Sequence, residues 1–233
     1  MSMHTGTGTE NMANDLAMIE MLNNSSANSL WRLYTWKPWA VSLGKHQSLD
    51  AVNLHEAATR GIDVVHRPTG GRAVLHADEL TYCVVARGAP SDVYVTVHEH
   101  IHKALCSILG DKAGELQFET VGADLRSHYS SGSDMGQACF ATSAKSEIMV
   151  HGRKVVGSAQ RVLNDVVLQH GSILCGPGHL LLSELVNIPD SNRSKFRAVL
   201  ESTSTTLTEV AGHVVTPTDI AYEISQNPNV LLV

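Results

Sequence analysis

A thiol and an ammonium group within one glycine-containing stretch are the first candidates for chemistry. Cys139 and Lys154 lie fifteen positions apart in CFATSAKSEIMVHGRKVVGSAQ, residues 139–160. A cysteine attacks carbonyl carbons as the thiolate, and a nearby ammonium lowers the pKa of a thiol. The pair could therefore serve nucleophilic acyl transfer. The spacing is not a motif, however, and by itself it favours a packed thiol and a lysine at the protein surface.

Two segments carry small residues that could admit a ligand. In RPTGGRAVLH, Gly70 and Gly71 separate two β-rich runs, and adjacent glycines let backbone N–H groups approach a ligand. A tight hairpin that needs positive φ explains this pair equally well. In GRKVVGSAQ, the small residues 157–159 interrupt a strand pattern and leave room for a ligand or another backbone. Neither segment has the spacing of a Walker loop or of a dinucleotide fingerprint.

Composition narrows the class of protein. The chain has 233 residues, of which 43% are hydrophobic and 17% charged, so it can enclose a core and a pocket. A net charge of −6 argues against nucleic-acid binding. The sequence contains no apolar run of membrane-spanning length, and its start, MSMHTGTGTE, lacks the features of a secretory signal. We therefore expect a cytoplasmic enzyme or binding domain that contacts neither nucleic acid nor membrane.

Metal binding is not expected. The four cysteines are far apart and form no C-x-x-C pair. His98, His100 and His102 alternate on a predicted helix and would point in different directions around it. We interpret these histidines as surface or structural residues, and Cys106 on the same helix as a packed thiol.

The hydrophobic pattern predicts helices and strands in alternation. Apolar spacing predicts helices over residues 12–25, 53–60 and 94–108, the last two ended by Gly61 and Gly110. LWRLYTW and WAVSLG read as strands joined at a bend, and IDVVHRPTGGRAVLHADELTYCVVA reads as a strand, a glycine loop and a hairpin. EIMV, RKVVGSAQRV and VVLQHGSIL read as a three-stranded meander.

The domain organisation follows from the same pattern. Residues 1–10 are small and polar and are expected to form a flexible tail, and residues 122–137 are expected to form a Gly/Ser-rich loop. Residues 11–233 are expected to form a single domain, whose last 50 or so residues are a short helical extension. Thr216 and Pro217 have the types expected at the start of its last helix.

Taken together, the segments resemble the biotin/lipoate A/B protein ligase family. The resemblance runs from about Asn11 to Cys175 through NMANDLAMIE, RLYTW, WAVSLGKHQS, GIDVVHRPTGGRAVLHADELTYCVV, ACF, EIMVHGRKVVGSAQ and VVLQHGSIL, in the order of the family. It implies an α/β (α+β) fold, a single domain with a mixed, largely antiparallel sheet packed by helices.

Within the family, the chain is most similar to the cysteine-dependent octanoyltransferases of lipoate synthesis. The ATP-using ligases usually have a third glycine where this chain has Arg72, and they have or recruit an accessory domain, whereas only about 58 residues follow Cys175. Members of the transferase subgroup carry a cysteine before a phenylalanine and an acidic strand, as Cys139-Phe140 and Glu147 do here. The arginine-rich signature of biotin ligases is missing.

The resemblance implies roles for individual residues. Cys139 would carry the octanoyl group as a thioester, and Lys154 would promote ionisation of the thiol and stabilise the oxyanion. The expected substrate-binding residues are Arg67, Gly70, Gly71, Arg72, Ala73, His76, Gly157, Ser158, Ala159, His170 and Gly171. No cofactor, metal or nucleotide has a role in this scheme.

The implied partners are large proteins. Octanoyl-acyl carrier protein would be the donor, and lipoyl-domain proteins, such as the glycine-cleavage H protein or dehydrogenase acyltransferase subunits, would be the acceptors. A monomer is expected. Three alternatives stay open: an ATP-dependent lipoate ligase, an amidotransferase that moves octanoyl from the H protein to other lipoyl domains, and a module that only binds lipoyl groups.

Overall fold

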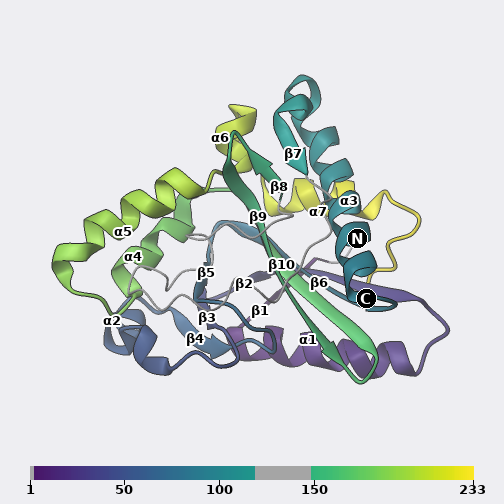
Figure 1. The fold of residues 1–233 in the computed structure, drawn as a ribbon, viewed down its shortest axis with the longest axis horizontal. Helices are drawn as coiled ribbons and strands as arrows, with labels where there is room; N and C mark the ends of the chain where they lie inside the picture. The colour runs from purple at the N-terminus through teal and green to yellow at the C-terminus, as the bar shows by residue number, and fades with distance from the viewer. Residues whose placement is uncertain (1–2, 119–147) are drawn as a thin grey trace.

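The computed structural model describes residues 3–118 and 148–233. A large sheet has seven strands in the order β1-β2-β6-β10-β9-β8-β7, and a small sheet has three in the order β4-β3-β5. All neighbours in the large sheet are antiparallel except β1 and β2, and in the small sheet β3 is parallel to β4 and antiparallel to β5. The expected mixed, largely antiparallel sheet packed by helices is confirmed (Figure 1).

The strands are β1 (His4–Gly6), β2 (Ser29–Trp36), β3 (Ala40–Leu43), β4 (Asp63–His66), β5 (Val74–His76), β6 (Glu79–Arg87), β7 (Leu116–Phe118), β8 (Ile148–Val150), β9 (Arg153–Leu163) and β10 (Val166–Leu174). The α-helices are α1 (Gly8–Asn23), α2 (Leu54–Thr59), α3 (Pro90–Leu109), α4 (Leu182–Leu185), α5 (Asp190–Thr203), α6 (Leu207–Ala211) and α7 (Pro217–Ser225). Short 3₁₀ helices are η1 (Leu49–Ala51), η2 (Gly110–Glu115) and η5 (Pro177–Leu181).

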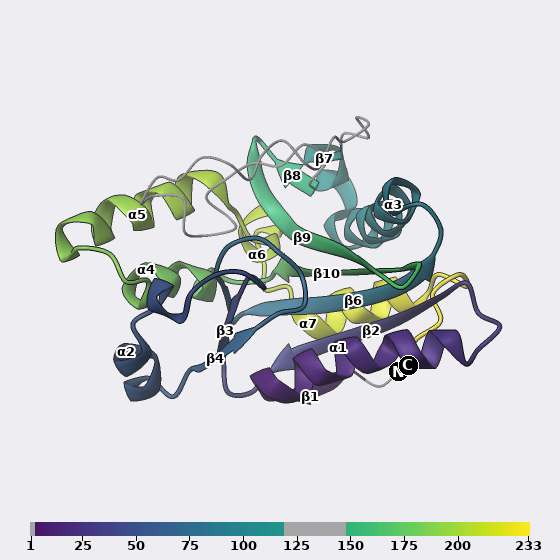
Figure 2. The same ribbon diagram turned by 60° about the horizontal axis from the view of Figure 1, so that its bottom comes forward.

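Helices cover both faces of the large sheet (Figure 2). The apolar residues of α1 pack with one face of β2, β6 and β10, while α3 and α7 pack on the opposite face. Alternation along β6 shows the division, because Tyr82 and Val84 belong to the α3 side and Cys83 and Val85 to the α1 side. A third cluster joins the small sheet to α2, α4 and α5.

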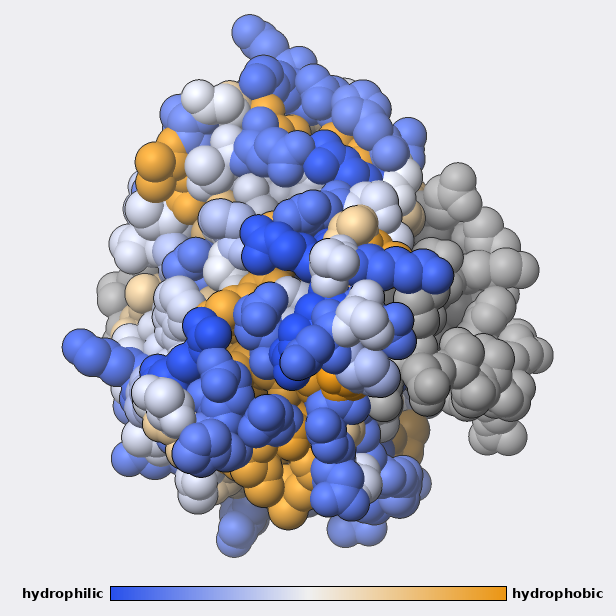
Figure 3. Space-filling view, turned by 90° about the vertical axis from the view of Figure 1, so that its left-hand side faces the viewer, coloured by the Kyte–Doolittle hydropathy of each residue, from blue (hydrophilic) through white to orange (hydrophobic). Residues whose placement is uncertain are grey.

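The surface over the third cluster is mainly hydrophilic (Figure 3). α5 lies at this side of the molecule and buries only Phe196 and Leu200, and its other residues are exposed or partly exposed. Such a one-sided helix is typical of a surface helix on a small core.

Most predicted elements are confirmed. The meander is formed by β8, β9 and β10, and its two turns place His151-Gly152 and Asn164-Asp165 at positive φ. α2 is followed by Gly61, and α3 is capped by Gly110, both at positive φ. The Thr216 hydroxyl caps α7 in a capping box.

Two expectations are wrong. Residues 4–10 form β1 and the start of α1 rather than a flexible tail, because β1 pairs with β2 and a capping box of Thr7 and Glu10 begins the helix. β5 and β6 do not form a hairpin, since β5 pairs with β3 and β6 pairs with β2 and β10. The chain crosses from the small sheet to the large sheet between β5 and β6. At this crossing the Asp78 carbonyl accepts hydrogen bonds from the N–H groups of Cys175 and Gly176.

The carboxy-terminal helices are part of the core. Ile220, Ala221 and Ile224 of α7 are buried in the same cluster as α3. The predicted loop at 122–137 lies outside the described residues. No helix in the described ranges is both long and apolar enough to cross a membrane.

Candidate functional site

A pocket lies between the large sheet and the layer formed by α1, β3, β5 and the loop before β5. It encloses about 440 Å³ of empty space, its open mouth included. It is lined by Met12, Tyr34, Trp36, Ser42, Arg67, Val74, His76, Thr81, Gly157, Ser158, Ala159, His170, Gly171 and Ser172. Segments far apart in the chain thus meet around one space.

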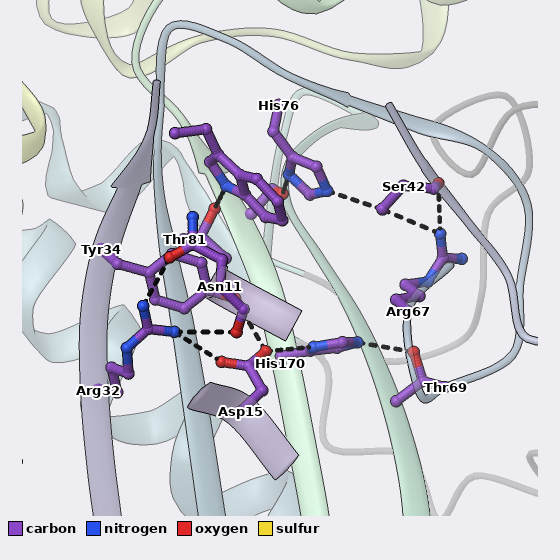
Figure 4. A network of polar contacts seen from close by, with 12 residues as sticks. Asn11, Asp15, Arg32, Tyr34, Ser42, Arg67, Thr69, His76, Thr81 and His170 are labelled. Carbon is purple, nitrogen blue, oxygen red and sulfur yellow. Dashed lines mark hydrogen bonds and ion pairs between the residues drawn. The ribbon is translucent and has the colours of Figure 1, made fainter. Parts of the chain in front are cut away.

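A carboxylate, an imidazole and a hydroxyl form a relay at one side of the pocket (Figure 4). His170 Nδ1 lies 3.0 Å from Asp15 Oδ2, and His170 Nε2 lies 2.7 Å from Thr69 Oγ1. Burial lowers the pKa of His170, although the hydrogen bond to Asp15 acts in the opposite direction. A lowered pKa favours the neutral ring, and the carboxylate favours the tautomer with its hydrogen on Nδ1, in which Nε2 accepts from the Thr69 hydroxyl.

Asp15 is also the centre of a buried ion pair. Arg32 Nη1 donates to Asp15 Oδ1 at 2.9 Å, and Tyr34 Oη donates to Asp15 Oδ2 at 2.9 Å. The second Arg32 nitrogen, Nη2, donates to Asn11 Oδ1 at 2.6 Å. Burial, followed by the charge of Asp15, raises the pKa of Tyr34 well above its ordinary value, so Tyr34 stays a hydrogen-bond donor. These contacts fix α1 on β2.

A second relay lies across the pocket from the first. His76 Nδ1 lies 2.7 Å from Glu79 Oε1, and His76 Nε2 lies 2.7 Å from Ser42 Oγ. Glu79 Oε1 also accepts from the hydroxyls of Thr81 at 2.6 Å and Ser172 at 2.8 Å. Trp36 stacks on the His76 ring with centroids 4.1 Å apart. The polar groups of this wall are thus bonded to one another, except Glu79 Oε2, which is buried without a hydrogen-bond partner.

Both relays end at the glycine loop. Thr69 belongs to the loop, and Ser42 accepts from Arg67 Nη1 through its carbonyl at 2.9 Å and its hydroxyl at 3.3 Å. Arg67 Nη2 donates to the carbonyls of Gly70 at 2.8 Å and Arg72 at 2.7 Å. Outside the pocket, Arg161 Nη1 donates to the Pro68 carbonyl at 2.9 Å. The loop is therefore held by side chains from three other elements.

The relays leave the pocket with a mostly apolar interior. Each ring nitrogen of His76 and His170 already has a hydrogen-bond partner, so the rings offer carbon atoms to a ligand. Gly171 lets β10 and β9 lie close together, because a Cβ on Gly171 would lie 2.4 Å from the Gly157 carbonyl oxygen and 2.8 Å from the Tyr82 ring on the α3 side. The close backbone approach predicted for the small-residue stretch of β9 occurs at this point. A narrow cavity of this kind accepts an unbranched apolar chain.

Comparison with known proteins identifies the family. The model of the lipoyl protein ligase A/B catalytic domain matches residues 7–227. The chain belongs to this family. Octanoyltransferase LipM of Symbiobacterium thermophilum is 37% identical over 89% of this chain and 76% of its own length, and LipM of Brevibacillus brevis is 35% identical over 88% and 76%. The predicted family, and its octanoyltransferase branch as the nearest resemblance, are confirmed.

Solved structures of the lipoyl ligase family share the fold. A bi-partite lipoate protein ligase from Thermoplasma acidophilum superposes with a TM-score of 0.68 at 19% identity, covering 97% of this chain and 82% of that one. Lipoate-protein ligase A bound with ATP has a TM-score of 0.63 at 20% identity, covering 97% and 83%. At these identities the likeness concerns the fold alone.

Seven of the predicted substrate-binding residues lie together at the pocket. These are Arg67, His76, Gly157, Ser158, Ala159, His170 and Gly171. Gly70, Gly71, Arg72 and Ala73 do not line it. They form the loop whose carbonyls accept hydrogen bonds from Arg67, and Gly71 has a φ of 95°. Gly71 also lies close to Gly44, because a Cβ on Gly44 would be 2.0 Å from the Gly71 carbonyl oxygen.

The two predicted catalytic residues have different outcomes. Cys139 lies outside the described residues. Lys154 lies on β9 three residues before Gly157, is 3% exposed and is not among the pocket residues. Its carbonyl accepts from the N–H of Thr205 at 2.9 Å, which joins β9 to the end of α5. Lysine side chains are rarely buried unless they are paired with a polar group. The catalytic role of Lys154 stays a prediction.

The other three cysteines are packed thiols in reduced form. Burial raises the pKa of Cys83 well above its ordinary value, raises that of Cys175 to about 12, and raises that of Cys106. None of the three lines the pocket. The expectation for Cys106 is confirmed. Among the described residues, no group of three or more His, Cys, Asp and Glu side chains could hold a metal ion.

Sequence reasoning missed half of the pocket wall and the carboxylates behind it. The missed lining residues are Met12, Tyr34, Trp36, Ser42, Val74, Thr81 and Ser172. The one available signal was Arg32 in the apolar strand LWRLYTW, since a charged residue in a buried strand needs a partner. The partner, Asp15, lies on a different element, and nothing in the pattern pairs the two residues.

Proposed function

We propose that the protein is an octanoyltransferase of lipoate biosynthesis, which moves an octanoyl group from acyl carrier protein to a lysine of a lipoyl domain. The observation that carries the proposal is the pocket, a narrow and mostly apolar cavity whose polar wall groups are bonded to one another. Relatives named octanoyltransferase at 34–37% identity over most of the chain support the same activity.

We propose Cys139 as the acyl carrier. Its thiolate would attack the thioester carbonyl, the donor sulfur would leave and take up a proton, and octanoyl-Cys139 would form. The lysine amine of the lipoyl domain would then attack the same carbonyl, lose a proton, and release the Cys139 thiolate. The three described cysteines support this role indirectly, because burial raises the pKa of each and disfavours its thiolate.

Lys154 would lower the pKa of Cys139 and stabilise the oxyanion of the tetrahedral intermediate. It precedes the pocket residue Gly157 by three positions, about 10 Å along an extended strand. The 14 residues between Cys139 and Lys154 include β8 and the turn at His151-Gly152, which return the chain toward β9. We also propose that the chain from β1 onward forms one catalytic domain and that the protein acts as a monomer in the cytoplasm.

An assay with three donors tests the activity. Purified protein is mixed with a lipoyl domain and one donor: octanoyl-acyl carrier protein without ATP, free octanoate with ATP and Mg²⁺, or octanoyl-H protein without ATP. We expect octanoylated lipoyl domain, seen as a mass increase, from the thioester only. Product from octanoate and ATP with release of pyrophosphate would instead identify a lipoate ligase. Product from octanoyl-H protein alone would identify an amidotransferase.

A further inference from the structure

The floor of the pocket is a row of residues that crosses four strands. Gly157 of β9 is paired with Ser172 of β10, Ser172 with Thr81 of β6, and Thr81 with Tyr34 of β2. All four line the pocket. Since neighbouring strands are about 4.8 Å apart, the row spans roughly 14 Å from β9 to β2. The pocket therefore runs across the sheet rather than along it.

The two ends of this row differ in exposure. At β9, residues 157–159 are partly exposed, so this end is open. At β2, Tyr34 has no exposed surface, and Met12 of α1, which packs in the same cluster, is only 7% exposed. A chain that enters at β9 therefore meets Tyr34 and Met12 last.

Tyr34 is a rigid part of the closed end. Its hydroxyl donates to Asp15 at 2.9 Å, and the Arg32 guanidinium carbon lies 3.9 Å from the centre of its ring. Moving the ring would break a buried hydrogen bond and expose a buried charge, which is costly.

Met12 is the adjustable part of the same end. Its backbone is held, because the preceding side chain, Asn11, donates to the carbonyls of Gly6 and Thr35, both at 3.1 Å. The Met12 side chain itself is unbranched and bends about three bonds, so it fills whatever space the neighbouring atoms leave.

We propose that Met12, which lines the pocket and shares an apolar cluster with the fixed Tyr34, is the specificity-determining residue that limits the length of the acyl chain. The inference rests on the proposed function, since it concerns the same pocket. An extended eight-carbon chain measures roughly 9 Å, because each of its C–C bonds of about 1.5 Å advances the zigzag chain by about 1.3 Å. This length fits a row of roughly 14 Å whose far end is filled by two side chains.

Replacing Met12 changes the available length by a known amount. Met12→Ala removes three side-chain atoms, enough for about two more methylene groups, and each buried methylene favours binding by a factor of about four. The kcat/KM for decanoyl relative to octanoyl donor should then rise by about fifteenfold. Met12→Leu keeps the volume and should keep the wild-type ratio.

The matched control is Met18→Ala. Met18 lies on the same helix and in the same apolar cluster and is 1% exposed, but it does not line the pocket. The same three atoms are removed, so a general loosening of α1 would appear equally in both alanine variants. Thermal unfolding shows which variants are folded, and Met12→Val replaces Met12→Ala if the latter does not fold.

The test measures transfer from hexanoyl to dodecanoyl carrier protein, and binding of the free fatty acids from hexanoate to dodecanoate by calorimetry. We expect only Met12→Ala to shift both profiles by about two carbons toward longer chains. Unchanged profiles in a folded Met12→Ala or Met12→Val, or an equal shift in Met18→Ala, would overturn the inference. In that case the proposed function still stands, provided that the wild type transfers the octanoyl group. If the wild type transfers no acyl group, the proposed function fails, and the binding profiles still decide the role of Met12.

Discussion

The two faces of the large sheet use buried polar residues in opposite ways. The face under α1 holds two buried acids, Asp15 and Glu79, each bonded to an imidazole at the pocket. The face under α3 and α7 is mostly aliphatic. Its main polar residues are Tyr82, His98 and Ser158, which hydrogen-bond to one another without an acidic partner. The face with charges builds most of the site, and the other face mainly supplies stability and reaches the pocket through Ser158.

Of the changes considered, removing Asp15 should lower the stability of the protein most. Asp15→Ala leaves the Arg32 charge and the His170 Nδ1 hydrogen without their buried acceptor, so we expect the free energy of unfolding to fall by about 3–5 kcal/mol. Urea denaturation measures it. Glu201→Ala, which removes an exposed partner of Arg197, should cost at most about 1 kcal/mol. A similar loss in both variants would contradict the importance of burial at the relay.

Leu105→Ala tests the aliphatic face. Leu105 of α3 is fully buried, and its truncation should cost about 3 kcal/mol through lost contacts and a cavity. The transfer rate per folded molecule and the KM for the acyl donor should stay at the wild-type values, because no α3 residue lines the pocket. A large change in KM would show that the two faces are coupled.

His98 should give a smaller effect that depends on pH. Burial lowers its pKa to about 4 from an ordinary 6.5, so below pH 6.5 the unfolded chain binds a proton that the folded protein refuses. The stability from this group is complete above pH 6.5 and falls as the pH drops toward 4. Between pH 7 and pH 5 the loss is about 2 kcal/mol.

His98→Gln isolates that contribution. The cost of altered packing is common to both pH values and cancels in the difference, so the variant should lose about 2 kcal/mol less than the wild type between pH 7 and pH 5. Buried His170 and His179, whose pKa values are also lowered by burial, keep both proteins sensitive to acid. An identical pH dependence of unfolding in both proteins would place a proton on His98 in the folded state.

Local signals in the sequence predicted the elements well. The turn residues around His151-Gly152 and Asn164-Asp165 specify the meander through their own backbone preferences, and Thr216 with Pro217 does the same for α7. The pairing of β5 with β3 could not be predicted in this way. It depends on Asp78 bonding to backbone groups that are almost a hundred residues away.

The candidate site was predictable only in part. Motifs located the glycine loop and the small residues of β9 and β10, because their types are unusual in strands. Met12 and Tyr34 look like ordinary core residues in the sequence, and only the register of β2, β6, β10 and β9 places them at the end of the pocket. Long-range register is a property of the fold, which local patterns do not encode.

The central claim is that Cys139 carries the acyl group. Wild-type protein and Cys139→Ala are incubated with octanoyl-acyl carrier protein, without acceptor, and the intact masses are measured. We expect one octanoyl group on the wild type and none on the folded alanine variant. The group, C8H15O, replaces the thiol hydrogen and adds about 126 Da. An octanoyl adduct on Cys139→Ala, or normal transfer by that variant to a lipoyl domain, would contradict the thioester mechanism.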